Sequence, residues 1–151
     1  MLVNTAIFGE IDVEEENILH MPYGPFGFDD RKTFALLEQE DDGAVFRWLQ
    51  SIDDESPCFV VFDPNEIVSD YSPEVETSDL RALGCKRISE LKFYVIAVVP
   101  EDFTKTTVNL KSPIAVNPDT NVAMQIILSN VDYPIRFPLV DEAAMREAVG
   151  E

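Results

Sequence analysis

Basic residues are scarce in this chain. Its 151 residues include 29 Asp and Glu but only 11 Lys and Arg, which gives a formal net charge of −18 at pH 7. Phosphate groups are bound through Lys and Arg, so this composition argues against a nucleic-acid-binding protein and against docking on an anionic membrane. The excess charge favours a basic partner, bound cations or solubility alone.

The imbalance lies almost entirely in the first half of the chain. Residues 1–80 contain 20 acidic and 3 basic side chains, a net charge of −17, whereas residues 81–151 contain 9 and 8, a net charge of −1. No flexible linker coincides with this change. Two surfaces of one domain therefore explain the asymmetry better than two domains do.

Histidine is almost absent, and cysteine is rare. The single histidine, His20, would have to serve as the base of any Ser-His-Asp or Cys-His mechanism, and no GxSxG nucleophile elbow accompanies it. Neither GxGxxG nor a P-loop occurs, and Cys and His do not cluster as zinc ligands do. Cys58 and Cys85 form no CxxC pair, and Cys58 is interpreted as a small buried hydrophobic residue. These absences remove most histidine-based mechanisms, and we expect no cofactor and no zinc centre.

Carboxylates alone leave two other chemistries open. Glu10, Asp12 and Glu14 alternate along one strand face about 7 Å apart and could bind Ca²⁺ or Mg²⁺, but the DxDxDG loop of an EF-hand is absent. A solvated strand face that discourages edge pairing explains the same pattern. A pair of acids could also hydrolyse glycosides, although a domain of this size rarely builds a sugar-binding cleft.

Long hydrophobic runs are missing too. The longest, Cys58–Phe62 and residues 93–100, are far too short to span a bilayer. The first residues have neither the basic start nor the apolar stretch of a signal peptide, which predicts a cytoplasmic protein. The length and the 46% hydrophobic content fit one domain, residues 1–151, with a substantial core.

Short runs rich in Val, Ile and Phe, separated by Pro, Asp and Asn, dominate the sequence. They predict strands at residues 6–13, 18–21, 33–38, 44–52, 57–63, 92–99, 106–110, 114–117 and 122–128. Residues 21–28, with two Pro and two Gly, predict a structured loop, and residues 68–76 predict an edge strand or extended linker. Helices are expected at residues 77–84 and in a C-terminal tail at about 139–151. The fold class is therefore mainly all-β: a compact antiparallel β-barrel-like or sandwich single domain with one or two short helices.

Acidic loop tips are the strongest candidates for a binding surface. They would form a negative patch that speeds encounter with a basic partner if they met on one rim, with apolar neighbours adding specificity. Solubility alone explains these residues equally well. Trp48, which shares a strand face with Phe46, is interpreted as a core residue. The tip residues are Glu40, Asp41, Asp42, Asp53, Asp54, Glu55, Glu101 and Asp102, with Phe59 and Phe103 as apolar neighbours.

Six segments carry motifs that occur in a fixed order over almost the whole chain. They are FGEI at 8–11, MPYGPFGF at 21–28, WLQSID at 48–53, FVVFDP at 59–64, TVNLKSPIAVN at 107–117, and QIIL at 125–128 followed by DYPIRFPL at 132–139. In this order they resemble the FGEI, FPEGLPGFE, FLWLQSVDD, FVVIDP, TANLLAPIVIN and QVIL…DYPLRHPL signatures of the bacterial flagellar assembly factor FliW. Each motif alone is weak, but six in sequence are a specific resemblance.

The resemblance implies a non-enzymatic regulator with a compact antiparallel β-barrel-like fold. Members of the family bind flagellin and the RNA-binding translational repressor CsrA, and they relieve repression of flagellin mRNA until flagellin accumulates and takes them away. The implied partners are flagellin and a basic CsrA-like repressor, without direct contact to nucleic acid or membrane; the oligomeric state is left open. A flagellin chaperone without a translational role is an alternative. Asn109, Lys111 and Asn117 match family motif positions and serve either turn structure or recognition.

Overall fold

The computed structural model describes residues 1–139, and strands dominate its secondary structure. Within these residues lie one α-helix, α1 (Thr77–Ala82), and 3-10 turns at Glu15–Asn17, Pro64–Glu66, Ile88–Glu90 and Phe103–Lys105. The mainly all-β prediction with a short helix is confirmed, whereas the predicted helical tail falls almost wholly on residues 140–151 and lies outside the described residues. The strands are β1 (Leu2–Thr5), β2 (Gly9–Asp12), β3 (Ile18–His20), β4 (Thr33–Asp41), β5 (Ala44–Ser51), β6 (Cys58–Phe62), β7 (Lys92–Val98), β8 (Thr107–Val108), β9 (Ile114–Asn117), β10 (Val122–Gln125) and β11 (Phe137–Pro138).

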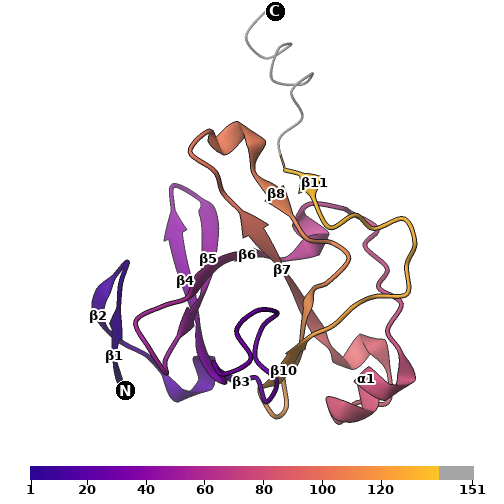
Figure 1. The fold of residues 1–151 in the computed structure, drawn as a ribbon, viewed down its shortest axis with the longest axis horizontal. Helices are drawn as coiled ribbons and strands as arrows, with labels where there is room; N and C mark the ends of the chain where they lie inside the picture. The colour runs from indigo at the N-terminus through magenta and orange to yellow at the C-terminus, as the bar shows by residue number, and fades with distance from the viewer. Residues whose placement is uncertain (140–151) are drawn as a thin grey trace, which may run out of the picture.

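Seven strands form a closed barrel in the order β7-β6-β5-β4-β3-β10-β9 (Figure 1). Closure depends on β7, which pairs with β9 through residues 92–94 and with β6 through Val95 and Ile96. Strands β3 and β10 pair in parallel, and the other barrel pairings are antiparallel. Closure thus gives partners to the two strands that would otherwise be exposed edges.

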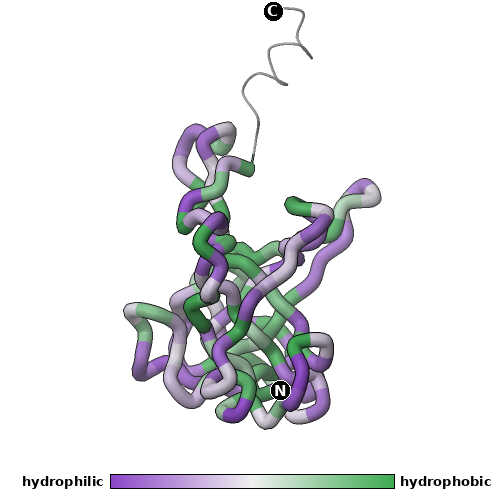
Figure 2. The backbone as a smooth tube through the Cα atoms, turned by 90° about the vertical axis from the view of Figure 1, so that its right-hand side faces the viewer, coloured by the Kyte–Doolittle hydropathy of each residue, from purple (hydrophilic) through white to green (hydrophobic). Residues whose placement is uncertain are grey.

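Two hairpins extend beyond the barrel. β4 and β5 stay paired as far as Asp41 and Ala44, although their pairing with β3 and β6 stops at Ala35 and Arg47. β7 continues past β6 to pair with β8, which also pairs with β11. Figures 1 and 2 show both hairpins projecting as separate arms. We call them the β4–β5 arm (residues 37–48) and the β7–β8 arm (residues 97–108).

Apolar side chains from the barrel strands fill its interior. Phe34 on β4 is 0% exposed and Leu49 on β5 is 1% exposed, because alternate residues of each strand point inward. This cluster contains Leu19, Met21, Phe34, Leu49, Val61, Ile114, Val116 and Ala123.

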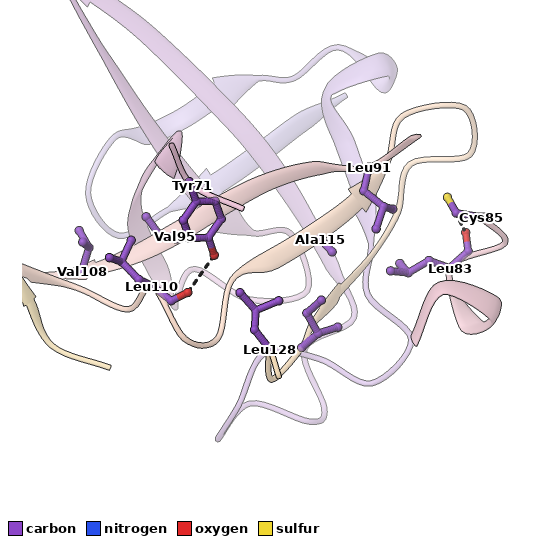
Figure 3. Close-up of a cluster of buried hydrophobic side chains, with 10 residues drawn as sticks. Tyr71, Leu83, Cys85, Leu91, Val95, Val108, Leu110, Ala115 and Leu128 are labelled. Atoms are coloured by element: carbon purple, nitrogen blue, oxygen red, sulfur yellow. Dashed lines mark hydrogen bonds between the residues drawn. The ribbon is translucent and has the colours of Figure 1, made fainter. Parts of the chain in front are cut away.

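A second cluster lies between the barrel and the segments that cover it (Figure 3). Residues 68–76 belong to this cover, because Tyr71 is 8% exposed and donates its hydroxyl hydrogen to the Leu110 carbonyl at 2.8 Å. No strand forms here, so the edge-strand alternative is wrong, and the segment is a linker that packs against the barrel. The cluster contains Tyr71, Leu83, Cys85, Leu91, Val95, Val108, Leu110, Ala115, Ile126 and Leu128.

The β1–β2 hairpin forms a separate two-stranded sheet over the outer face of β3 and β4. Val3 and Ile11 pack there with Ala35. The predicted strand at residues 6–13 forms only in its second half. Thr5 Oγ1 accepts the N–H of Phe8 and donates to the Gly9 carbonyl, both at 2.8 Å, and these bonds close a turn over residues 6–8.

Candidate partner-binding surface

The three acidic tips do not meet on one rim. Asp42 lies at the turn where β5 begins, and Asp53 follows the end of β5, so these two tips lie at opposite ends of one strand. Glu101 lies on the β7–β8 arm, which projects separately (Figure 2). The condition for a single negative rim is therefore not met, because the turns before and after β5 lie at opposite ends of that strand.

Asp53 is a structural residue of the loop between β5 and β6. Its Oδ2 accepts the backbone N–H groups of Lys32 at 2.7 Å and Thr33 at 3.1 Å, which ties the loop to the start of β4. Such charge-assisted bonds are stronger than bonds between neutral groups. A lysine at position 53 would therefore disturb folding as well as binding.

The other two carboxylates of this loop are exposed. Asp54 Oδ2 lies 3.3 Å from Arg31 Nη2, a surface ion pair of the kind that contributes little to stability. The carbonyl oxygen of Glu55 accepts the N–H of Ala6 at 3.1 Å, which places Glu55 beside the turn of the β1–β2 hairpin. Glu55 therefore presents an exposed charge beside this turn.

The tip of the β7–β8 arm combines charge with exposed apolar side chains. Asp102 Oδ1 accepts the hydroxyl of Thr104 at 2.5 Å and its N–H at 3.1 Å, and these bonds lower the pKa of Asp102. Phe103 is 70% exposed and Val98 is 66% exposed. Glu101, Asp102 and Phe103 therefore lie together on an apolar arm with an acidic tip.

Asn117 has partners inside the protein. The side chain is 5% exposed, its Nδ2 donates to the Leu83 carbonyl at 2.8 Å, and its Oδ1 accepts the N–H of Asp119 at 3.0 Å. These bonds join the end of α1 to the turn between β9 and β10. Its position matches turn structure rather than direct contact with a partner.

Asn109 and Lys111 hold neighbouring loops in the same way. Asn109 Oδ1 accepts the N–H of Ser112 at 2.9 Å, and Lys111 Nζ donates to the Asn130 carbonyl. Both side chains are half-buried. They position the segment that leads from β8 into β9.

Phe59 links the loop at residues 21–28 to the barrel. Its ring lies edge-on to Phe28 with ring centroids 5.4 Å apart, and 6.3 Å from Phe34 in the barrel interior. Phe59 is half-buried, and these ring contacts are part of the packing between the loop and the barrel.

An aromatic surface on the β4–β5 arm was not predicted. Trp48 is half-buried outside the barrel core, with Phe8 edge-on at 5.2 Å and Phe46 at 6.3 Å between ring centroids. The interpretation of Trp48 as a core residue is wrong, because strand alternation does not say which face of a projecting hairpin is covered. Next to these rings lies a hollow of about 230 Å³, the aromatic notch, which is lined by Phe8, Ile11, Asp12, Leu37, Glu38, Gln39 and Trp48.

The Cys58 thiol is expected to react slowly with iodoacetamide. Burial raises the pKa of Cys58 to about 11, so only about one thiol in a thousand is ionised at pH 8, and the thiolate is the reactive form. Labelling at pH 8 should be at least about tenfold slower than for an unstructured cysteine peptide, and should accelerate as the pH rises toward 11. Mass spectrometry of the Cys58 peptide measures the rate; labelling as fast as the free peptide would contradict it.

The structure gives the metal hypothesis no support. Among residues 1–139, no three His, Cys, Asp or Glu side chains converge as metal ligands would. Asp12, one of the carboxylates on β2, pairs with the Met1 ammonium at 3.0 Å. In the same part of the chain, no helix has the length and apolarity to cross a membrane.

Comparison with known proteins gives a consistent set of relatives. The chain matches the family model described as "FliW protein" over residues 2–139. It is 35% identical over 147 residues to the flagellar assembly factor FliW of Ruminiclostridium cellulolyticum, covering 97% of this chain and 99% of that protein. It is 38% identical over 143 residues to that of Natranaerobius thermophilus, covering 94% of each. A crystal structure of the flagellar assembly factor FliW is similar with a TM-score of 0.83 and 30% identity, covering 94% of this chain and 99% of that chain.

Proposed function

The chain belongs to the FliW family of flagellar assembly factors, and on this basis we propose that it is a non-enzymatic, cytoplasmic regulator of flagellar assembly. It binds flagellin, and by protein–protein contact it antagonises an RNA-binding translational repressor of the CsrA type. The observation that carries the proposal is the family match over residues 2–139. The net charge of −18 supports it, because a repressor that holds RNA must be basic.

Two different surfaces suit the two partners. The loop at residues 53–55 and the β1–β2 hairpin adjoin through the Glu55–Ala6 hydrogen bond and form an acidic surface for the basic repressor. The β7–β8 arm exposes Val98, Val99 and Phe103 and suits an apolar face of flagellin. The proposed contact residues are Asp53, Asp54, Glu55, Glu101, Asp102 and Phe103. In this proposal Phe59, Asn109, Lys111 and Asn117 have structural roles.

A flagellin chaperone without a translational role is the second candidate. The exposed apolar side chains of the β7–β8 arm favour it, because they suit flagellin and do not require a basic partner. The two functions differ in one respect only: a chaperone of this kind would not bind the repressor.

Copurification with tagged flagellin and with a tagged CsrA-type repressor, separately and in competition, tests the proposal. We expect both to retain the chain, and added flagellin to displace it from the repressor. Capture by flagellin alone would favour the chaperone. Capture by neither would overturn both candidates.

Binding to the repressor should weaken steeply with salt. Raising the ionic strength from about 50 mM to 500 mM should slow association at least about tenfold, because electrostatic steering between exposed charges is screened. Glu55→Lys should slow association at low salt, whereas Asp132→Lys, the same change of charge on an exposed loop of the second half, should not. Surface plasmon resonance gives these rates, and a flat salt response would remove the electrostatic part of the proposal.

A further inference from the structure

The extended segment that continues β10 has one open edge. The N–H groups of Ile126 and Leu128 donate to the carbonyl oxygens of Pro113 and Lys111, both at 3.0 Å. Main-chain groups alternate between the two edges of an extended strand, so the N–H and C=O of Ile127 point the opposite way. Within residues 1–139, neither of these two groups makes a hydrogen bond. This edge is therefore available to another strand.

The neighbouring segments pair with this edge only at its two ends. At one end, the N–H of His20 on β3 donates to the Asn121 carbonyl at 2.8 Å. The next donor of a parallel ladder would be two residues later, at Pro22, which has no N–H. At the other end, the N–H of Ser129 donates to the Glu74 carbonyl at 2.9 Å. The open stretch lies between these two contacts.

A groove of about 520 Å³ lies along the open stretch. Its lining includes two apolar side chains, Phe26 and Ile127, which are 50% and 59% exposed. It also includes the carboxylates of Glu76 and Asp79 at the start of α1. The four steps from residue 125 to residue 129 span about 13 Å at ~3.3 Å per residue, so the groove has room for a short extended segment.

The charges of the groove favour a basic occupant. Its lining contains no Lys or Arg. Burial, and then the neighbouring Glu76, raise the pKa of Asp79, as expected for a carboxylate without a cationic partner. A second copy of this chain, paired edge to edge, would bring the same carboxylates together and be repelled.

The groove lies at the same end of the barrel as the acidic loop at residues 53–55. β3 and β5 both run antiparallel to β4, and β10 runs parallel to β3, so β3, β5 and β10 all end on one side. The acidic loop follows β5, and the open stretch follows β10. One partner can therefore contact both.

We propose that an extended segment of the basic repressor adds a short strand to the open edge at Ile127. Its main chain pairs with the N–H and C=O of Ile127, its apolar side chains pack on Phe26, and a Lys or Arg side chain pairs with Glu76 and Asp79. A helix would leave the edge unpaired, because its own main-chain groups are bonded internally. The inference rests on the proposed function for the identity of the partner, and adds a main-chain contact to the acidic loop.

Hydrogen exchange of the Ile127 amide tests the pairing directly. In the free full-length chain this amide should exchange faster than that of Leu128, which is bonded. A CsrA-type repressor should slow exchange at Ile127 at least about tenfold and leave the exposed Phe103, on the β7–β8 arm, unchanged. Binding without protection of Ile127 would overturn the inference and leave the proposed function standing. Protection by flagellin and not by the repressor would overturn it too.

Two substitutions at position 127 separate the main chain from the side chain. Ile127→Pro removes the unbonded N–H, and proline is tolerated where the N–H of an edge strand faces solvent. Ile127→Ala removes the apolar side chain but keeps the N–H, so it is the matched control. In calorimetry, Ile127→Pro should raise the Kd for the repressor about tenfold above that of Ile127→Ala, the effect of one hydrogen bond. Equal Kd values for the two folded variants would overturn the pairing, and if Ile127→Pro fails to fold, exchange at Ile127 in the unaltered chain decides.

Neutral variants test the charge of the occupant. Glu76→Gln combined with Asp79→Asn should raise the Kd about tenfold and reduce its salt dependence. Asp70→Asn combined with Asp132→Asn removes two exposed charges outside the groove lining and should raise it at most about twofold. Equal effects of the two pairs would overturn the basic occupant. Absence of repressor binding by the unaltered chain would overturn the inference together with the proposed function.

Discussion

Replacing Gly24 with alanine should lower the free energy of unfolding by more than about 3 kcal/mol, a large effect for one methyl group. Gly24 has a φ of +65° within the loop at residues 21–28. An added Cβ would lie 2.2 Å from the Phe28 carbonyl oxygen, 2.9 Å from the Asp29 Cα and 3.0 Å from the Arg31 carbonyl oxygen. All three are backbone atoms, which cannot turn aside as a flexible side chain can.

The loop cannot relieve this contact cheaply because it is bonded to itself. The N–H of Gly24 donates to the Met21 carbonyl at 3.0 Å, that of Phe28 to Pro25 at 2.8 Å, and that of Arg31 to Phe28 at 3.0 Å. Met21 is 0% exposed inside the barrel. Moving the loop to admit a Cβ would therefore break turn hydrogen bonds or shift a core residue.

Gly27→Ala is the matched control in the same loop. Gly27 has a φ of +85°, but a Cβ there would meet nothing within 4 Å. Only the left-handed backbone conformation then opposes alanine, at a cost of about 1–2 kcal/mol. Urea denaturation compares the two variants, and equal losses would contradict a backbone clash at Gly24.

The central strands could be predicted from the sequence because their signals are local. Residues 33–38, 44–52 and 57–63 correspond to β4, β5 and β6, since apolar runs and turn-forming residues mark both ends. The closure of the barrel by β7 and β9 has no such signal. It depends on pairing Lys92 with Val116 and Tyr94 with Ile114, which lie far apart in the chain.

In the candidate surface, too, local sequence signals predict residue types, whereas long-range contacts decide the roles of the residues. Residue type identified Asp53 and Glu55 as candidates, but their different tasks follow from hydrogen bonds that cross from one loop to another. The aromatic notch combines Phe8, Leu37 and Trp48 from segments that the sequence pattern treats independently. Strand alternation predicts which side chains share one face of the β4–β5 arm. It does not predict that the β1–β2 hairpin covers part of that face.

Tyr71 is a further residue whose role depends on distant contacts. Its ring stacks on Tyr133 with centroids 4.8 Å apart and meets Phe93 edge-on at 6.4 Å. Its hydroxyl donates to the Leu110 carbonyl at 2.8 Å (Figure 3). Burial, and then the neighbouring Tyr133, raise the pKa of Tyr71, so the hydroxyl stays protonated and keeps this bond at any physiological pH.

Tyr71→Ala should therefore lower the free energy of unfolding by about 3–5 kcal/mol, because it removes a buried ring and leaves the Leu110 carbonyl without its donor. Tyr71→Phe keeps the ring and should cost only about 1–2 kcal/mol. Urea midpoints at an unchanged m-value give both losses. If Tyr71→Ala and Tyr71→Phe lost the same free energy of unfolding, the hydroxyl rather than the ring would hold residues 68–76 in place. A loss below about 1 kcal/mol for Tyr71→Ala would mean that residues 68–76 contribute little to stability, and that the cluster in Figure 3 does not depend on them.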